Sequence, residues 1–275
     1  MCPAVQPGGT TAITCRESLQ SNTAYFKKRA IESQRLNAEH LVAHSLGKKR
    51  IELYLNFERP LSEPELVPLR ELVRRRGQGE PLQHLLGTVE FGEQTFVSDK
   101  RALIPRPETE QLVEYLCDLA LPRAGRFLDV GTGSGVIILS LAARFPDAEL
   151  HAVDLSADAL ALARENAARL GLTERVQFSE SDLLLYVTHV YDLIVANLPY
   201  VAESERAKLA PEVLRDPAAA LFGGPAGDEL IRALIVAAPA HPTPGRAPPR
   251  ESGEAPPEAA PALLTTNNSH SPPHN

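Results

Sequence analysis

The pattern of apolar and polar positions divides the chain into a helical first part and an alternating second part. Between residues 17 and 87, apolar residues recur at the intervals of three and four that mark one face of an α-helix. The clearest case is the stretch from Ser62, which can cap a helix, to Gly77, which can end it. We therefore expect an α-helical domain over residues 17–87, preceded by a flexible terminus over residues 1–16.

The second part alternates strand-like and helix-like patterns. Residues 88–104 show a short polar–apolar alternation that predicts a β-hairpin linker. Beyond it, strand-like stretches separated by helical patterns predict a buried strand at 126–130 and further strands at 149–156, 175–182 and 191–197. This alternation is typical of an α/β domain with a parallel sheet and helices on both faces, which we expect over residues 105–240.

The segment 241–275 breaks both patterns. It holds nine prolines and almost no large apolar residue. Such a composition predicts a disordered tail that forms no strand and packs no core.

Composition excludes several classes of protein. The formal net charge is -7 and the basic clusters at 48–50 and 74–76 are short, so stable nucleic-acid binding is not expected. No apolar run reaches the roughly 18–20 residues of a membrane span, and the first residues do not form a secretory signal. The three cysteines have neither disulfide nor metal-ligand spacing. We expect a cytoplasmic protein, monomeric and without a metal.

A glycine-rich turn follows the strand at 126–130. The sequence LDVGTGSG contains Asp129, Gly131, Thr132, Gly133 and Gly135 between a predicted strand and a predicted helix. Glycines serve where the backbone turns tightly and approaches a ligand. The spacing differs from the dinucleotide motif and lacks a phosphate-binding lysine, which favours a cofactor without phosphates, S-adenosylmethionine.

Two further acids follow the next strands. Asp154 can accept both ribose hydroxyl protons of a nucleoside, or can be an ordinary acid at a helix N-terminus. Asp182 can accept from the adenine amino group, with backbone contact from Leu183, or can be a simple turn acid. We count all three residues as candidate cofactor contacts.

The strand at 191–197 ends in Asn197-Leu198-Pro199-Tyr200. The Asn197 side-chain oxygen and the Leu198 carbonyl can each accept one N–H of a planar NH2 group, while Pro199 stiffens the turn and Tyr200 stacks on the group. In a doubly wound sheet the carboxyl end of this strand lies beside the cofactor. The alternative is a plain strand-ending turn.

Several of these motifs together resemble a known family. LIPRPETEQLVEYL, LDVGTGSGVI, VDLS, DLIVANLPYV and RRRGQGEPLQHLLG are similar to the HemK/PrmC family, the protein-(glutamine-N5) methyltransferases of peptide chain release factors. The resemblance implies a class I, Rossmann-like S-adenosylmethionine-dependent fold with a small N-terminal helical domain that docks the substrate. It implies methylation of the glutamine in a Gly-Gly-Gln loop of a release factor.

The resemblance also assigns roles to residues. Asn197, Pro199 and Tyr200 would be catalytic, and Asn197 would also lie against the cofactor. Arg106, in the IPRPETE segment, would contact the substrate, and Pro107, Thr109 and Glu110 would shape the pocket.

The sequence departs from the family pattern in two places. Leu198 replaces a proline, and Asn-Leu-Pro-Tyr also occurs in adenine-N6 methyltransferases, so an RNA or DNA acceptor stays an alternative. After Gly245 the expected last strands are missing, which suggests a shifted reading frame or a truncated, non-catalytic paralogue. The edge of the strand at 191–197 would then be exposed.

Overall fold

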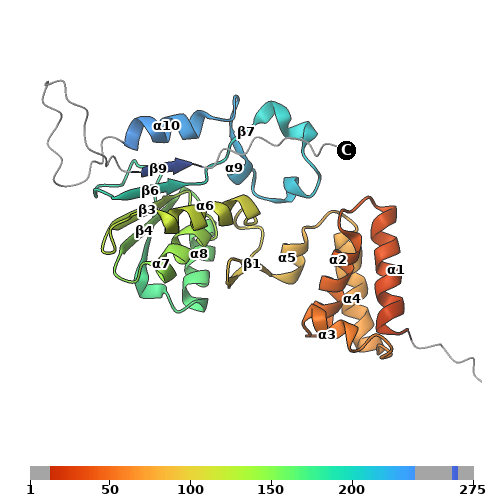
Figure 1. Cartoon of the computed structure of the whole chain (residues 1–275). Helices are drawn as coiled ribbons and strands as arrows, with labels where there is room; N and C mark the ends of the chain where they lie inside the picture. The colour runs from red at the N-terminus through yellow and green to blue at the C-terminus, as the bar shows by residue number, and fades with distance from the viewer. Residues whose placement is uncertain (1–12, 239–261, 266–275) are drawn as a thin grey trace, which may run out of the picture. The chain divides into compact units, whose positions relative to one another are not determined.

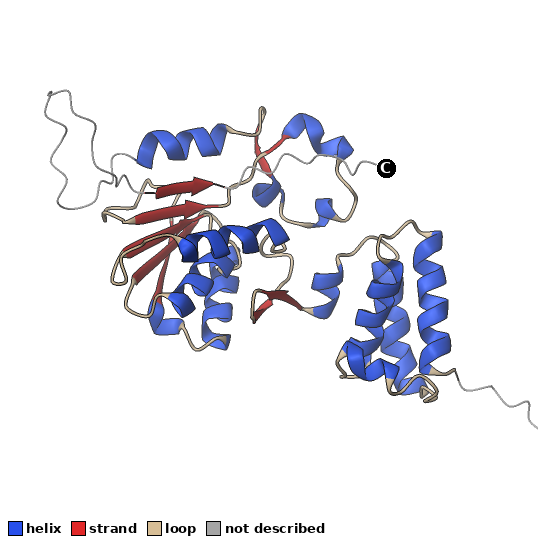
Figure 2. Cartoon of the chain, viewed as in Figure 1, coloured by secondary structure: helices blue, strands red, loops and turns tan. Residues whose placement is uncertain are grey.

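The computed structural model describes residues 13–238 and 262–265. The chain separates into two compact units, Met1–Leu86 and Gly87–Asn275. Figures 1 and 2 show a helical first unit and a second unit built around a sheet. Within the described residues, no helix combines the length and the apolar character needed to cross a membrane.

The first unit is a bundle around a core that includes Phe26, Leu41, Leu53 and Leu69. Its helices are α1 (Cys15–Lys28), α2 (Gln34–Ser45), α3 (Arg50–Tyr54), α4 (Glu63–Arg76) and α5 (Leu82–Leu86). At the start of α4, the Ser62 hydroxyl and peptide N–H both donate to the Glu65 carboxylate, at 2.9 Å each.

The expected flexible terminus over residues 1–16 is wrong for its last residues. Helix α1 begins at Cys15, and Thr14 caps it: the Thr14 hydroxyl accepts from the Glu17 N–H at 3.2 Å, and Glu17 accepts from the Thr14 N–H at 2.8 Å. This reciprocal pair is a capping box, which satisfies donors that a helix start leaves unpaired. Residues 1–12 of the expected flexible terminus lie outside the described part of the chain.

The second unit contains a parallel sheet with the strand order β5-β4-β3-β6-β9. The strands are β3 (Arg126–Val130), β4 (Glu149–Asp154), β5 (Val176–Glu180), β6 (Leu193–Ala196) and β9 (Ala262–Thr265). The chain runs outward from β3 to β5 and then returns to the other side of β3 as β6. The carboxyl ends of β3 and β6 therefore flank the point where the strand order reverses, which is where such sheets bind ligands.

Strand β9 corrects the expectation that residues 241–275 form no strand. The segment Ala262–Thr265 pairs in parallel with Leu193–Ala196, so the β6 edge is covered. The physical reason is that a short Ala-Leu-Leu-Thr run needs only an open strand edge to pair with, whatever its proline-rich flanks. The other residues of the segment 241–275 lie outside the described part of the chain.

Alternate residues of β3 and β6 face opposite layers. Phe127 and Leu193 pack in a core with α6 (Pro107–Asp118), α7 (Val136–Arg144) and part of α8 (Ala157–Arg169). Leu128 and Ile194 pack on the other face with α10 (Glu229–Ala237), which is drawn above β9 in Figure 1. Both faces are covered, which explains the nearly continuous apolar runs of these strands.

Two small sheets flank the main one. Strands β1 (Thr88–Phe91) and β2 (Gln94–Val97) form an antiparallel hairpin just before α6. Strand β7 (Val201–Ala202) directly follows the Asn-Leu-Pro-Tyr segment and pairs in parallel with β8 (Phe222–Gly224). Helix α9 (Ala218–Leu221) immediately precedes β8.

Candidate active site

The turn between β3 and α7 adopts a conformation that requires glycine. Gly131, Gly133 and Gly135 have φ values of 71°, 57° and 83°, all in the left-handed region. A Cβ on Gly135 would lie 3.2 Å from the Cβ of Ala163 on α8, so this glycine also permits close packing of that helix. The peptide N–H groups of Gly131, Gly133 and Gly135 donate to the Val153 carbonyl, the Asp154 carboxylate and the Thr132 carbonyl, so the turn is held in shape by the protein itself.

The glycine turn lies against the Asn-Leu-Pro-Tyr segment. A Cβ on Gly131 would come within 2.9 Å of the Leu198 Cδ2 atom. Leu198 is buried, while its neighbours Asn197 and Pro199 are half-buried. The two motifs that the sequence singled out are therefore in contact at the reversal point between β3 and β6.

Asp129 is buried beneath the glycine turn. One of its oxygens accepts from the Thr132 hydroxyl at 2.7 Å, and both side chains are almost completely buried. Burial raises the pKa of Asp129 to about 7, against the lowering effects of the Thr132 hydroxyl and the Ile138 peptide N–H. This placement favours a role in holding the turn over direct contact with a cofactor.

Asp154, at the end of β4, is joined to the glycine turn. Its two carboxylate oxygens accept from the Gly133 N–H and the Ser156 N–H, each at 2.8 Å. Ser156 in turn caps α8 by accepting from the Ala159 N–H at 3.2 Å. A carboxylate has about four acceptor positions, so Asp154 retains capacity for two hydroxyl donors.

Asp182 and Leu183 follow β5 at the same edge of the sheet. Asp182 is exposed, as a ligand contact requires. Leu183 has a φ of 49°, a left-handed conformation that is unusual for a bulky side chain. Such backbone strain concentrates at functional sites and supports a backbone contact at Leu183.

The Asn197 side chain is oriented by α6. Its Nδ2 donates to the Thr109 Oγ1 at 3.0 Å, across 88 residues of sequence. Thr109 is buried, with 3% of its surface exposed. The IPRPETE segment therefore contacts the Asn-Leu-Pro-Tyr segment directly, through the hydrogen bond between Thr109 and the Asn197 amide.

Tyr200, in the Asn-Leu-Pro-Tyr segment, lies close to charged groups of the IPRPETE segment. Its side chain is half-buried, and burial raises the pKa of Tyr200, an effect increased by Glu108 and opposed by Arg106. The Tyr200 phenol therefore stays neutral at physiological pH.

Arg106 forms an ion pair with a residue that the sequence reading did not select. Its Nη2 lies 2.9 Å from the Oδ2 of Asp216, whose side chain is 1% exposed. Burial raises the pKa of Asp216 to about 6, against the lowering influence of Arg106 and the Ile104 peptide N–H. Asp216 therefore anchors the IPRPETE segment to the region between β7 and β8. In the sequence, Asp216 is marked only by the proline that follows it, and Asp-Pro pairs occur in many ordinary turns.

Two glycines were also overlooked. A Cβ on Gly223 would lie 2.4 Å from the Pro199 carbonyl oxygen, and one on Gly227 would lie 2.5 Å from the Tyr200 carbonyl oxygen. Strand β8 and the loop after it therefore pack on the backbone of the Asn-Leu-Pro-Tyr segment. The Gly-Gly-x-x-Gly pattern indicated a loop in the sequence, but not which segment it contacts.

The comparisons with known proteins agree with this arrangement. The PrmC N-terminal domain model matches residues 17–87, and the methyltransferase small domain model matches residues 107–228. A "Release factor glutamine methyltransferase" of Chlorobaculum tepidum is 43% identical over 235 residues, which are 81% of this chain and 80% of the relative.

Other relatives carry the same name. The protein of Rhodopirellula baltica is 41% identical over 82% of this chain and 79% of the relative. The protein of Geobacter sulfurreducens is 41% identical over 84% of this chain and 81% of the relative. The sheet is that of a class I S-adenosylmethionine-dependent methyltransferase, as the sequence predicts. The chain belongs to the family of release factor glutamine methyltransferases.

Proposed function

We propose that this chain transfers a methyl group from S-adenosylmethionine to the side-chain amide nitrogen of a glutamine in the Gly-Gly-Gln loop of a peptide chain release factor. The printed names of its relatives support the substrate class. The observation that carries the proposal is the orientation of the Asn197 amide by Thr109, beside the glycine turn.

The cofactor would be held at the ends of three strands. The backbone of Gly131 and Gly133 and the carboxylate of Asp154 would hold its amino-acid and ribose parts, and Asp182 with the Leu183 backbone would contact the adenine. Asp129 and Thr132 would keep the glycine turn in shape. When bound, the cofactor supplies an electrophilic methyl group on a sulfonium.

The acceptor amide would be positioned by the Asn-Leu-Pro-Tyr segment. A planar amide is a weak nucleophile because its nitrogen lone pair is delocalised. The Asn197 Oδ1 and the Leu198 carbonyl would accept its two N–H groups, fixing the nitrogen in place without a strong base. Tyr200 would stack on the amide, Pro199 would stiffen the turn, and Arg106 would contact the neighbouring substrate backbone.

The first unit would dock the release factor, and the enzyme would act as a cytoplasmic monomer. An acidic protein with formal net charge -7 is poorly suited to a nucleic-acid substrate, which favours glutamine over adenine as the acceptor.

The test is transfer of labelled methyl groups from the cofactor to purified release factor or to ribosomal RNA. We expect label in the protein, at the glutamine, and none in the RNA. Asn197→Ala is expected to lose about a hundredfold or more in kcat while keeping cofactor affinity. Label in RNA would replace this proposal with adenine methylation, and no label in either would indicate a non-catalytic paralogue.

A further inference from the structure

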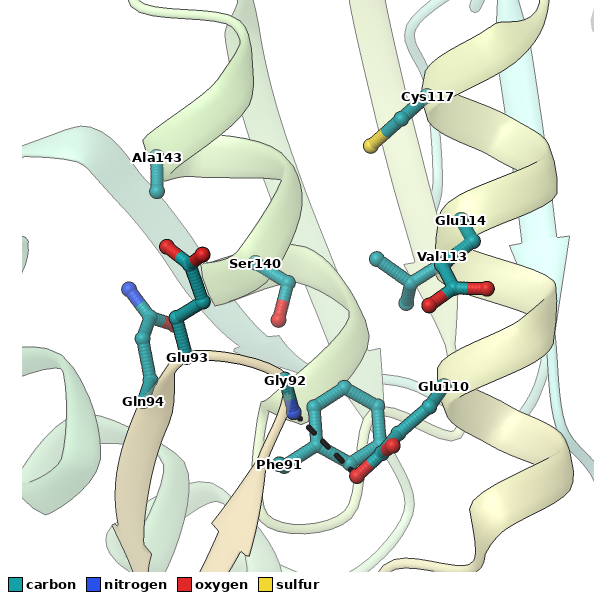
Figure 3. A pocket seen from close by; sticks show the side chains of 10 residues that line it. All are labelled: Phe91, Gly92, Glu93, Gln94, Glu110, Val113, Glu114, Cys117, Ser140 and Ala143. Carbon is teal, nitrogen blue, oxygen red and sulfur yellow. Dashed lines mark hydrogen bonds between the residues drawn. The ribbon is translucent and has the colours of Figure 1, made fainter.

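The β1–β2 hairpin is tied to the rest of the catalytic unit at both of its ends. At the hairpin turn, the Gly92 N–H donates to the Glu110 carboxylate of α6 at 3.3 Å, and Figure 3 shows this bond. Phe91 and Phe96 are buried in the core that contains residues of α6 and α7. The far end of the hairpin, at Val97, is held by a single side chain of α8.

That side chain is Asn166, which is completely buried and makes three hydrogen bonds. Its Oδ1 accepts from the Val97 N–H at 2.6 Å, and its Nδ2 donates to the Val97 carbonyl at 3.2 Å and to the Ser134 carbonyl at 2.9 Å. These partners determine the orientation of the amide, because only the oxygen can accept from an N–H and only the nitrogen can donate to two carbonyls. One residue of α8 therefore holds both the hairpin and the segment that contains Ser134.

Ser134 lies inside the glycine turn, between Gly133 and Gly135. Both glycines have a left-handed φ and no side chain of their own that could hold them in it. The Asp154 carboxylate accepts from the Gly133 N–H at 2.8 Å, and the Asn166 amide donates to the Ser134 carbonyl at 2.9 Å. Two side chains therefore hold successive parts of this turn, one from the end of β4 and the other from α8.

The chain that follows the hairpin also packs on the glycine turn. A Cβ on Gly133 would lie 3.8 Å from the Cβ of Ala102. Ala102 is buried in an apolar cluster with residues of α8, and Val97 packs against the same cluster. The end of the hairpin and the glycine turn therefore share two connections, a polar one through Asn166 and an apolar one through Ala102.

We infer that Asn166 is a positioning residue of the cofactor site, which keeps the glycine turn in its binding geometry and couples that turn to the hairpin. Without the Asn166 amide, the buried Ser134 carbonyl would lack this partner, an unfavourable state that a change in the shape of the turn would relieve. The inference rests on the part of the proposed function that places S-adenosylmethionine at this turn. Because coupling between two sites is reciprocal, cofactor binding should also stabilise the hairpin end at Val97.

The experiment compares Asn166→Ala with a matched control, Asn37→Ala. Asn37 is a buried asparagine of the first unit whose amide also makes three hydrogen bonds: it donates to the Glu32 and Ser33 carbonyls and accepts from the Arg76 Nε. Both variants should lower Tm, but only Asn166→Ala should raise the Kd for S-adenosylmethionine, by about tenfold. Isothermal titration at a temperature where both variants are folded measures this Kd.

A second measurement needs only the wild-type chain. The Val97 N–H, which Asn166 holds, should exchange its hydrogen several-fold more slowly when S-adenosylmethionine is added. The Gly92 N–H, which is bonded to Glu110 at the opposite end of the hairpin, should exchange at an unchanged rate. Amide exchange followed by NMR compares the two groups in one sample.

The outcomes separate the two proposals. If the wild type binds S-adenosylmethionine and Asn166→Ala keeps the wild-type Kd, the inference is overturned while the proposed function stands. If Asn37→Ala raises the Kd equally, the effect is one of general stability, and the inference also fails. If Asn166→Ala does not fold, the exchange of Val97 decides, and a rate that the cofactor leaves unchanged overturns the inference. If the wild type binds no S-adenosylmethionine, the proposed function fails and the inference falls with it.

Discussion

The side-chain amide of Asn197 donates a 3.0 Å hydrogen bond to the hydroxyl of Thr109, joining the end of β6 to the first turn of α6. An asparagine amide can turn over and exchange its donor and acceptor ends. In this bond the Nδ2 end faces the Thr109 hydroxyl, and the other end, Oδ1, is the acceptor that a substrate NH2 group needs.

Thr109→Val should therefore lower kcat by about tenfold to a hundredfold, because the Asn197 amide loses its hydrogen bond to the Thr109 hydroxyl. Thr109→Ser keeps the hydroxyl and should retain most of the activity. Cofactor affinity should not change in either variant. Steady-state kinetics and cofactor titration measure these effects, and a Val variant with wild-type kcat would show that Thr109 does not position Asn197.

The raised pKa of the buried Asp129 carboxyl should make the free energy of unfolding depend on pH. Its pKa is about 7 in the folded chain and near 3.8 in an unfolded one. Between these values the folded state holds a proton that the unfolded state releases, so the contribution of Asp129 to stability falls as pH rises from about 4 to about 7. The free energy of unfolding of the wild type, relative to Asp129→Asn, should fall by a few kcal/mol over that window and stay constant above it.

Urea unfolding at several pH values between 4 and 8 measures this difference. Asp216 acts in the same direction, because its pKa is raised to about 6. The difference in free energy of unfolding between the wild type and Asp129→Asn isolates the contribution of Asp129. If that difference did not vary with pH, Asp129 would not be buried in its protonated form.

The role of the loop after β8 can be tested by comparing a glycine in that loop, Gly227, with a control glycine elsewhere, Gly171. Both have a left-handed backbone conformation. Gly227 has a φ of 94° and Gly171 a φ of 71°, but only at Gly227 would a Cβ meet other atoms, within 2.5 Å of the Tyr200 carbonyl oxygen. Gly171→Ala should cost about 1 kcal/mol of stability and no activity. Gly227→Ala should cost about 2–3 kcal/mol and lower kcat at least tenfold, because the Tyr200 backbone must move. Equal kcat in the two variants would argue against a role for this loop.

Strand β9 predicts the effect of removing residues 262–275. The deletion uncovers the β6 edge, so the free energy of unfolding should fall by about 2 kcal/mol or more, and the protein should associate as its concentration rises. Deleting residues 266–275 leaves β9 in place and is the matched control. Unfolding curves and light scattering measure both, and equal behaviour of the two truncations would show that β9 contributes nothing.

The elements that the sequence predicts well are those with strong local signals. Strand β6 follows from a continuous apolar run, β3, β4 and β5 follow from their alternation with helical patterns, and the cap of α8 follows from Ser156. Thr14 and Glu17 formed a capping signature that was overlooked because proline and glycine precede it.

The features that were missed depend on distant partners. Arg106 and Asp216 are 110 residues apart, and nothing in either local sequence specifies their pairing. Strand β9 likewise depends on the edge of β6, since its own short apolar run carries almost no strand signal. Asp129 was selected as a cofactor contact on the glycine motif, and only the structure shows that it is buried beneath the turn.

The pairing of β9 with β6 also orders the assembly of the catalytic unit. Strands β3, β4 and β5 pair in series and β6 pairs with β3, all through residues that precede 262–265 in the chain. The other edge of β6 gains its partner only when residues 262–265 have been synthesised. A nascent chain can therefore complete the strands that carry the glycine turn and Asp154 before the strand that ends at the Asn-Leu-Pro-Tyr segment acquires its second neighbour.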